Sequence, residues 1–368
     1  MIDSLKPKRL FLGKKLSNKS MEGQLLPKTI ALPIFSSDPL SSVAYGPQEL
    51  LMILTLGGIS FLAFAPWIAA MVVILLTVIV LSYRKVIKAY PSGGGDYEVA
   101  QKNLGEKSAL TVASALLLDY VMTVAVSISS GTDNIISAFP ELDPYRVEIA
   151  VGFVLFLLAI NLRGVRESGF AFAVPTYLFL ATVVLLIGTG IYKLLAGIPI
   201  VAPSANYELI PESTLVATPF LVVMLLLRSF ASGSAALTGI EAIANGVPAF
   251  RQPKVKNAQI TMTWMGASAV FMFVGIITFG LISGVQYMEN PDLQGHPLNS
   301  PQLSVMAQLG IAIFGNGSIL FYVLQAATAA ILLLAANTAF NGFPLLTSVL
   351  AKDGYAPKAL LTRGDRLV

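Results

Sequence analysis

Long apolar segments dominate this sequence and restrict the folds that it can adopt. We place eight of them, at residues 30–56, 58–83, 108–132, 147–162, 169–195, 218–248, 257–284 and 306–349. Several approach or exceed the roughly 20 apolar residues that cross a bilayer. With 55% hydrophobic residues and a mean hydropathy of +0.75, the chain is too apolar to cover a water-soluble surface. The sequence therefore predicts an all-α integral membrane protein with about eight transmembrane helices.

The distribution of basic residues predicts the orientation. Of the 24 Lys and Arg residues, all but Arg146, Lys193 and Arg228 fall in loops on one side of the predicted helices. Loops rich in Lys and Arg stay in the cytoplasm. Residues 1–28 are basic and carry no cleavage-like site, so we interpret them as a cytoplasmic leader of a multi-pass protein of the cell membrane.

The first apolar segment contains polar residues where a regular membrane helix is expected. The stretch FSSDPLSSVAYGP, Phe35 to Pro47, includes a carboxylate and two prolines. Proline removes a backbone donor and clashes with the carbonyl four residues earlier, and freed backbone groups are tolerated only in protein or in a water-filled cavity. We therefore predict a break around residues 36–40. Asp38 inside the membrane costs on the order of 3 kcal/mol and implies a partner, a proton or a bound cation.

The sixth segment, Arg228 to Pro248, shows the same features. Gly233 and Gly239 interrupt it within a Ser-rich stretch, and it carries Glu241 inside the apolar run. Two broken helices five spans apart are typical of an inverted-repeat transporter with its binding site near the bilayer midplane. This pattern divides the chain into a leader, a first repeat with helices 1–5 and a truncated second repeat with helices 6–8. These parts cover residues 1–28, 29–200 and 201–368.

The third segment adds a polar stripe. Asp119, Thr123 and Ser127 are spaced i, i+4 and i+8, so they share one helical face, and Tyr120 follows Asp119. Ser and Thr also pack between membrane helices without further function, but the acid in the same stripe favours a binding role.

These segments together supply hard oxygen donors, which suit hard cations. The donors are the carboxylates Asp38, Asp119 and Glu241 and the hydroxyls Tyr45, Thr123, Ser127 and Thr238. We expect Arg228 to pair with one of the carboxylates. Burial and nearby like charges raise carboxyl pKa values, which makes Glu241 the candidate proton carrier. The sequence has no cysteine, and no nucleophile–base pair or metal motif is visible, so neither an enzyme nor a bound cofactor is expected. We expect membrane lipid around the chain and no nucleic acid partner.

Several motifs resemble the amino acid–polyamine–organocation superfamily, and within it the potassium importers of the KUP group. They are SSDPLSSVAYG, YPSGGGDY, LLLDYVMTVAVS, ALTGIEAIANGVPAF followed by RQPK, and LAKDGYAPKAL. The similarity runs from about Phe11 to the last residue. The resemblance implies a LeuT-like fold of inverted five-helix repeats (5+5) and potassium import driven by proton symport.

The resemblance also implies roles for residues and partners. By motif position, Asp38 and Tyr45 would lie near the ion in the broken first helix. Asp119, Tyr120, Thr123 and Ser127 would contribute from helix three. Thr238 would coordinate from the sixth helix, and Glu241 would be the titrating carboxylate. Homodimers and inhibition by cyclic di-AMP, through a cytoplasmic C-terminal domain, are further implications.

The sequence departs from the family pattern in two respects. We expect it to lack helices 9–12, including an aromatic residue near the ion, and the regulatory domain. Pro39 also occupies a position where a small residue such as alanine is expected. The local backbone is therefore expected to differ from that of the family.

Three alternatives remain at this point. An amino acid permease of the same fold would bind an α-carboxylate on free N–H groups of a glycine-rich break, whereas SSDPLSS has no glycine and carries an acid. The ammonium groups of a polyamine would pair with that acid as well as a metal cation does. A non-transporting scaffold or sensor would have little use for three acids inside the membrane.

Overall fold

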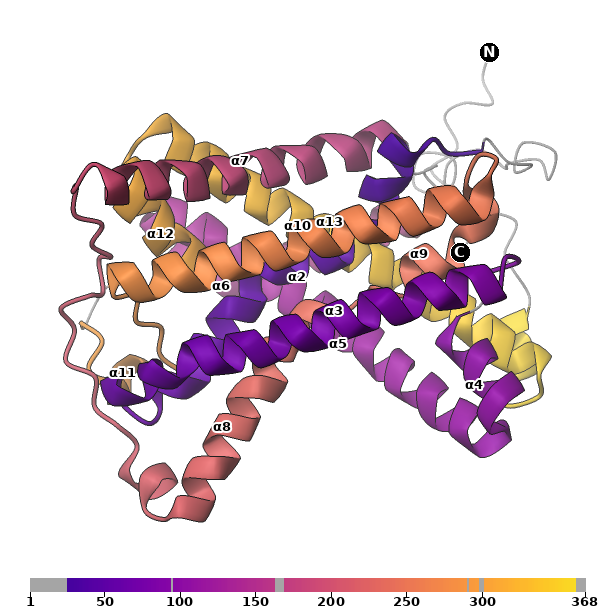
Figure 1. Cartoon of the computed structure of the whole chain (residues 1–368), viewed down its shortest axis with the longest axis horizontal. Helices are drawn as coiled ribbons and strands as arrows, with labels where there is room; N and C mark the ends of the chain where they lie inside the picture. The colour runs from indigo at the N-terminus through magenta and orange to yellow at the C-terminus, as the bar shows by residue number, and fades with distance from the viewer. Residues whose placement is uncertain (1–24, 94, 163–168, 290, 298–300, 362–368) are drawn as a thin grey trace.

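The computed structural model describes residues 25–93, 95–162, 169–289, 291–297 and 301–361. Long helices lie roughly along one direction and form a bundle, while α8 and α4 diverge from it at an angle (Figure 1). Within the described ranges the only β pairing is an isolated bridge between Leu26 and Phe250. The predicted all-α architecture is therefore confirmed.

The helices follow one another in the order of the predicted segments. The α-helices are α2 (Lys28–Thr55), α3 (Ala65–Ala89), α4 (Asp96–Leu104), α5 (Glu106–Ala138), α6 (Arg146–Leu162), α7 (Gly169–Leu195), α8 (Pro219–Gly233), α9 (Ala242–Asn245), α10 (Lys254–Ser283), α11 (Pro291–Gln294), α12 (Val305–Phe314) and α13 (Ile319–Lys352). Short 3-10 helices are η2 (Ile59–Phe64), η3 (Pro140–Tyr145), η4 (Ser213–Val216), η5 (Ser234–Leu237), η6 (Val247–Ala249) and η7 (Lys358–Leu361).

Seven helices in the described part of the chain are long and apolar enough to cross a membrane, one fewer than the eight predicted. The first predicted segment accounts for the difference, because α2 is long enough but too polar to be among the seven. Its polar side chains are buried by protein: every residue from Ser36 to Gln48 is buried. α2 packs against α7, α8, α10 and α13. These helices, and not lipid, surround its polar side chains.

The predicted break in the first helix is wrong. α2 runs without interruption through Pro33, Pro39 and Pro47. Neighbouring helices can satisfy the backbone groups that a proline frees in a membrane helix. At Pro33 the structure shows how: the Tyr177 hydroxyl of α7 donates to the carbonyl of Thr29, four residues before the proline, at 2.8 Å.

The predicted break in the sixth segment is confirmed. α8 ends at Gly233, η5 follows, and Thr238 is extended with φ −63° and ψ 150°. Gly239 then takes a positive φ of 73°, a conformation that glycine adopts without steric cost. The helix resumes as the short α9. The sixth segment therefore changes direction between two helical pieces.

The eighth segment is also divided into two helices, α12 and α13. The turn between them contains Gly315 and Gly317, which both have a positive φ. α5 packs along α13, and α10 packs along α3. Only 6% of the most apolar window of α6 is buried, compared with 56% for α10 and α13. α6 is therefore peripheral, and α2, α10 and α13 form the centre of the bundle.

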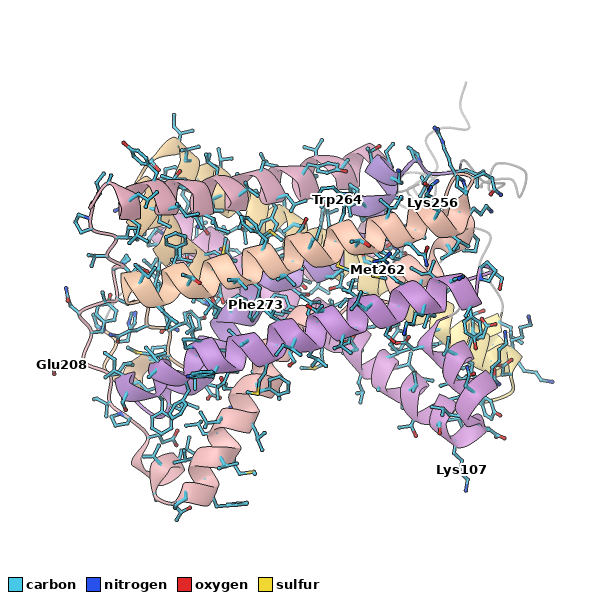
Figure 2. The ribbon with its side chains drawn as sticks, viewed as in Figure 1. Lys107, Glu208, Lys256, Met262, Trp264 and Phe273 are labelled. Carbon is cyan, nitrogen blue, oxygen red and sulfur yellow. The ribbon has the colours of Figure 1, made fainter. Side chains whose placement is uncertain are left out.

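The two ends of the bundle differ in charge in the way that the loops predict. Lys107 and Lys256 lie at one end and Glu208 at the other (Figure 2). A turn that includes Gly93, with φ 87°, separates α3 from α4 at the basic end. Helix α4 begins directly after this turn, at Asp96.

Candidate functional site

The centre of the bundle holds a cluster of polar side chains where α2 meets the break in the sixth segment. We call it the crossing cluster; its members are Asp38, Ser42, Tyr45 and Thr238. The first three lie one helical turn apart on one face of α2, and Thr238 is the extended residue of the break. The α2 side chains are buried, with exposed fractions of 5% or less.

The Ser42 hydroxyl contacts the other three members of the crossing cluster. Its Oγ lies 2.8 Å from Thr238 Oγ1, 2.9 Å from the Tyr45 hydroxyl and 3.4 Å from Asp38 Oδ1. Tyr45 and Thr238 are also 3.4 Å apart, hydroxyl to hydroxyl. Ser42 was not among the site residues predicted from the sequence, although its i+4 spacing from Asp38 places both on the same helical face.

Two glycines allow this close approach. A Cβ on Gly239 would collide with the Asp38 carboxylate, and a Cβ on Gly46 would lie 2.7 Å from the Cβ of Ala236 in η5. Side chains at these positions would push α2 away from the break. The glycines therefore bring the carboxylate of one segment against the backbone of the other.

The α5 stripe lies near the crossing cluster but does not bond to it. Thr123 and Ser127 are buried, at 4% and 0% exposure, and Ser127 Oγ has no hydrogen-bond partner among the described residues. Asp119 is half-buried, and its charge interacts with that of Asp38. The Tyr120 ring packs against Gly342 of α13, where a Cβ would lie 2.9 Å from it.

Glu241 is buried, at 7% exposure, directly after the break. Its backbone carbonyl accepts from Asn245 N at 3.0 Å and so begins α9. Among the described residues no Lys or Arg forms an ion pair with Glu241, Asp38 or Asp119. Nor do any three acidic, His or Cys side chains in that part of the chain converge tightly enough to hold a metal ion between them. The three acids are thus neighbours rather than one three-carboxylate site.

Arg228 does not serve the role predicted for it. Its Nη2 lies 2.7 Å from Glu289 Oε1, and its side chain is half exposed. At the same end of the molecule, Arg146 pairs with Asp133 and, at 3.0 Å, with Asp143. The expected ion pair between Arg228 and one of the carboxylates Asp38, Asp119 and Glu241 is therefore wrong.

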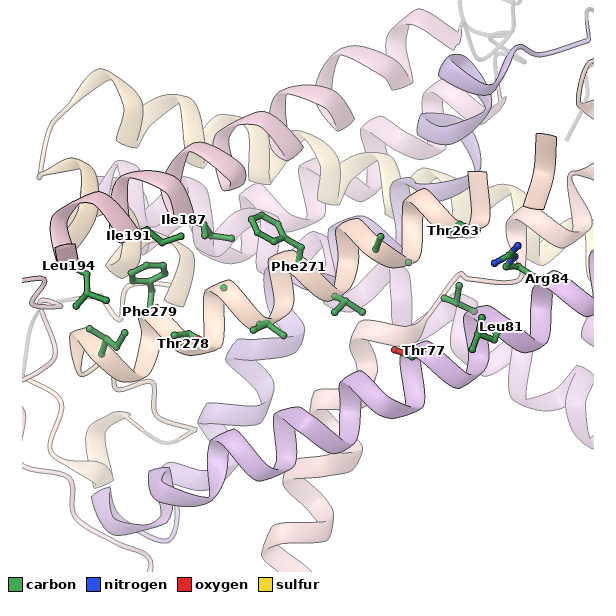
Figure 3. A pocket seen from close by; sticks show the side chains of 17 residues that line it. Thr77, Leu81, Arg84, Ile187, Ile191, Leu194, Thr263, Phe271, Thr278 and Phe279 are labelled. Carbon is green, nitrogen blue, oxygen red and sulfur yellow. The ribbon is translucent and has the colours of Figure 1, made fainter. Parts of the chain in front are cut away.

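An apolar hollow lies away from the crossing cluster. An apolar groove of about 740 Å³ runs along α10 between α3 and α7, with Arg84 at one end and Phe279 towards the other (Figure 3). Leu81, Phe271 and Ile282 in its wall are about half exposed. It contains no member of the crossing cluster, so it is part of the outer surface of the bundle and not the candidate site.

Two relatives are similar to this chain to very different extents. The potassium transporter KimA of Bacillus subtilis is 43% identical over 363 residues, which cover 98% of this chain and 56% of KimA. The low-affinity putrescine importer PlaP of Escherichia coli is 27% identical over 128 residues, 35% of this chain and 27% of PlaP. The chain thus spans little more than half the length of KimA.

The amino acid permease family matches residues 32–366, nearly the whole sequence. This range includes most of α2, the broken sixth segment and the α5 stripe. The resemblance drawn from the sequence motifs to the amino acid–polyamine–organocation superfamily is therefore confirmed, and a transporter is the class of protein that the match supports rather than an enzyme. The chain belongs to the amino acid permease family of membrane transporters.

Proposed function

We propose that this protein imports potassium ions by secondary active transport, coupled to protons, with the ion bound at the crossing cluster. The observation that carries the proposal is the set of oxygen atoms around Ser42 Oγ: two hydroxyls and a carboxylate within 3.4 Å. Hydroxyl, carboxylate and backbone oxygens are the ligands that hard cations prefer. KimA, described as a potassium transporter, supports the choice of ion.

Three segments would contribute ligands to the ion. Asp38 supplies the charge, and Tyr45 and Thr238 supply neutral oxygens on the same side of α2. The extended backbone at Thr238 leaves carbonyls outside the helical hydrogen-bond pattern, as at other transporter breaks. Thr123 and Ser127, with Asp119 and Tyr120 beside them, would complete the site from α5. The hydroxyl of Ser127, which has no hydrogen-bond partner among the described residues, supports this role.

Glu241 is our candidate for the proton carrier. It is buried next to the break and has no ion-pair partner in the described part of the chain. A buried unpaired charge is costly, so binding a proton there removes a penalty that the site otherwise bears. Because Glu241 and Asp38 interact electrostatically, loading one with a cation changes the affinity of the other for a proton.

The larger architecture is proposed on the same grounds. Residues 29–200 would form the first inverted repeat and residues 201–368 the available part of the second, in the LeuT-like (5+5) arrangement. Residues 1–28, on which the predicted leader falls, lie almost wholly outside the described ranges. We place the basic end of the bundle in the cytoplasm. Homodimer formation and cyclic di-AMP inhibition stay predictions of the resemblance.

The test is uptake into liposomes that contain the purified full-length protein and an internal pH dye. Potassium, then sodium, then putrescine and a panel of amino acids are added outside. We expect acidification of the lumen with potassium alone, and none with Glu241→Gln. Asp38→Asn should reduce potassium uptake at least tenfold. Acidification with an amino acid but not with potassium would contradict the proposal.

A second candidate is a cationic amine. The similarity to the putrescine importer PlaP favours it, because an ammonium group would meet the same carboxylate and hydroxyls. In the same assay, acidification by putrescine without potassium would select this alternative and leave the crossing cluster as the binding site.

A further inference from the structure

A carboxylate outside the crossing cluster lies beside the candidate proton carrier. Asp96 is the first residue of α4, at the basic end of the bundle. The Tyr83 hydroxyl of α3 lies 2.7 Å from both of its carboxylate oxygens and donates to them. Asp96 is half-buried, so it reaches solvent while being held by the helix bundle.

The turn before α4 packs against the end of α9. A Cβ on Gly95, the residue before Asp96, would lie 2.9 Å from Asn245 Oδ1, and one on Gly93 would lie 2.8 Å from the Asn245 carbonyl oxygen. Asn245 is one helical turn from Glu241, to whose carbonyl it donates. The backbone thus sets Asp96 beside the broken segment that carries Glu241.

The electrostatic interactions of Glu241 agree with this placement of Asp96. Among the carboxylates around Glu241, Asp96 interacts with it most strongly, ahead of Asp38 and Asp119. Tyr83 and Tyr120 each interact with both acids. No Lys or Arg forms an ion pair with Asp96 among the described residues. The group therefore consists of two acids and two tyrosines.

We propose that Asp96 relays protons between Glu241 and the basic end of the bundle, and that Tyr83 positions it for this transfer. This inference rests on the proposed proton coupling through Glu241. Protonated Glu241 gives its proton, through water, to the Asp96 carboxylate; Glu241 becomes a carboxylate and Asp96 a carboxylic acid. Asp96 then releases the proton to solvent and returns to its ionised form.

The environment of Asp96 suits a group that takes up and releases protons. Burial raises the pKa of the Asp96 carboxyl, and the hydrogen bond from Tyr83 offsets part of this rise because it stabilises the ionised form. Losing that hydrogen bond would raise the pKa further. The pH at which Asp96 loses its proton would then move to higher values.

The test compares three variants in the liposome assay over a range of external and internal pH. Asp96→Asn should slow potassium-driven acidification at least tenfold. Tyr83→Phe should keep transport but move its pH midpoint upward by about one unit, the size expected for one hydrogen bond to a charged group. Glu98→Gln is the matched control, because Glu98 lies on the same helix and pairs with exposed Lys102; it should behave as the unmodified protein.

A second measurement separates a relay from a structural role. Potassium should raise the Tm of Asp96→Asn as much as it raises that of the unmodified protein, since the relay does not touch the ion. Unchanged acidification in Asp96→Asn, or loss of the potassium-dependent Tm shift, would overturn the inference. If the unmodified protein responds to putrescine instead of potassium, the proposed ion is wrong and the same comparison is made with putrescine. Absence of acidification with every substrate would overturn both proposals.

Discussion

The first and sixth segments meet at the crossing cluster, but they contribute to it in different ways. α2 supplies three side chains and remains a continuous helix through Pro33, Pro39 and Pro47. The sixth segment supplies one hydroxyl and loses its helical geometry at Thr238 and Gly239. A proline inside a helix removes one hydrogen bond that neighbours can replace, whereas a residue with positive φ redirects the chain. The comparison shows that proline and glycine are not equivalent signals of a broken membrane helix.

The largest effect should follow from Gly239→Ala. A positive φ costs an L-residue about 1–2 kcal/mol, and the new Cβ would also displace the Asp38 carboxylate. We expect uptake to fall at least 100-fold. Gly197→Ala is the control, because Gly197 has a similar φ of 69° but open space around its Cβ position. Equal losses in both variants would show that backbone strain, and not the contact with Asp38, limits transport.

An intermediate effect is expected from Ser42→Ala. The hydroxyl that contacts the other three members of the crossing cluster is lost, at a net cost of about 1–1.5 kcal/mol. The potassium concentration for half-maximal uptake should rise about tenfold. Ser41→Ala provides the comparison, since Ser41 Oγ is equally buried but donates only to the Asp38 backbone carbonyl, at 2.8 Å. A similar rise in Ser41→Ala would remove the special role of Ser42.

The smallest effect should follow from Pro39→Ala. Alanine is favoured over proline inside a helix by about 3 kcal/mol, and α2 is already continuous at this residue. We expect uptake within about twofold of the unmodified protein and a higher Tm. A large loss of uptake at unchanged Tm would mean that α2 has to bend at Pro39 during transport, and the contrast with the sixth segment would disappear.

The sequence predicted some of these features because their physical cause is local. Gly239 interrupts the helix through its own backbone preference for a positive φ, so the break in the sixth segment was predictable. The i, i+4 spacing in the third segment likewise predicted that Thr123 and Ser127 share a face, and both are buried.

Other features depend on neighbours that the sequence does not reveal. The continuity of α2 depends on contacts such as that from Tyr177 to Thr29. Arg228 was expected to pair with an acid inside the membrane, but its partner Glu289 comes from a distant loop. Asp96 follows a glycine-rich connection, and nothing in the sequence indicates that it lies near Glu241. The structure shows this through the packing of that turn against Asn245. Whether Asp38, Thr238 and the α5 stripe bind an ion together remains a prediction.

The bridge between Leu26 and Phe250 has a mechanical consequence. Leu26 N donates to Ala249 O at 2.8 Å, and Arg251 N donates to Leu26 O at 3.0 Å, while the Phe35 and Phe250 rings stack 5.6 Å apart. The first and sixth segments are therefore fastened together at the basic end as well as at the crossing cluster. Contacts at two separate places along their length oppose independent tilting of the two segments. We therefore expect the first and sixth segments to move as one unit and not independently of each other.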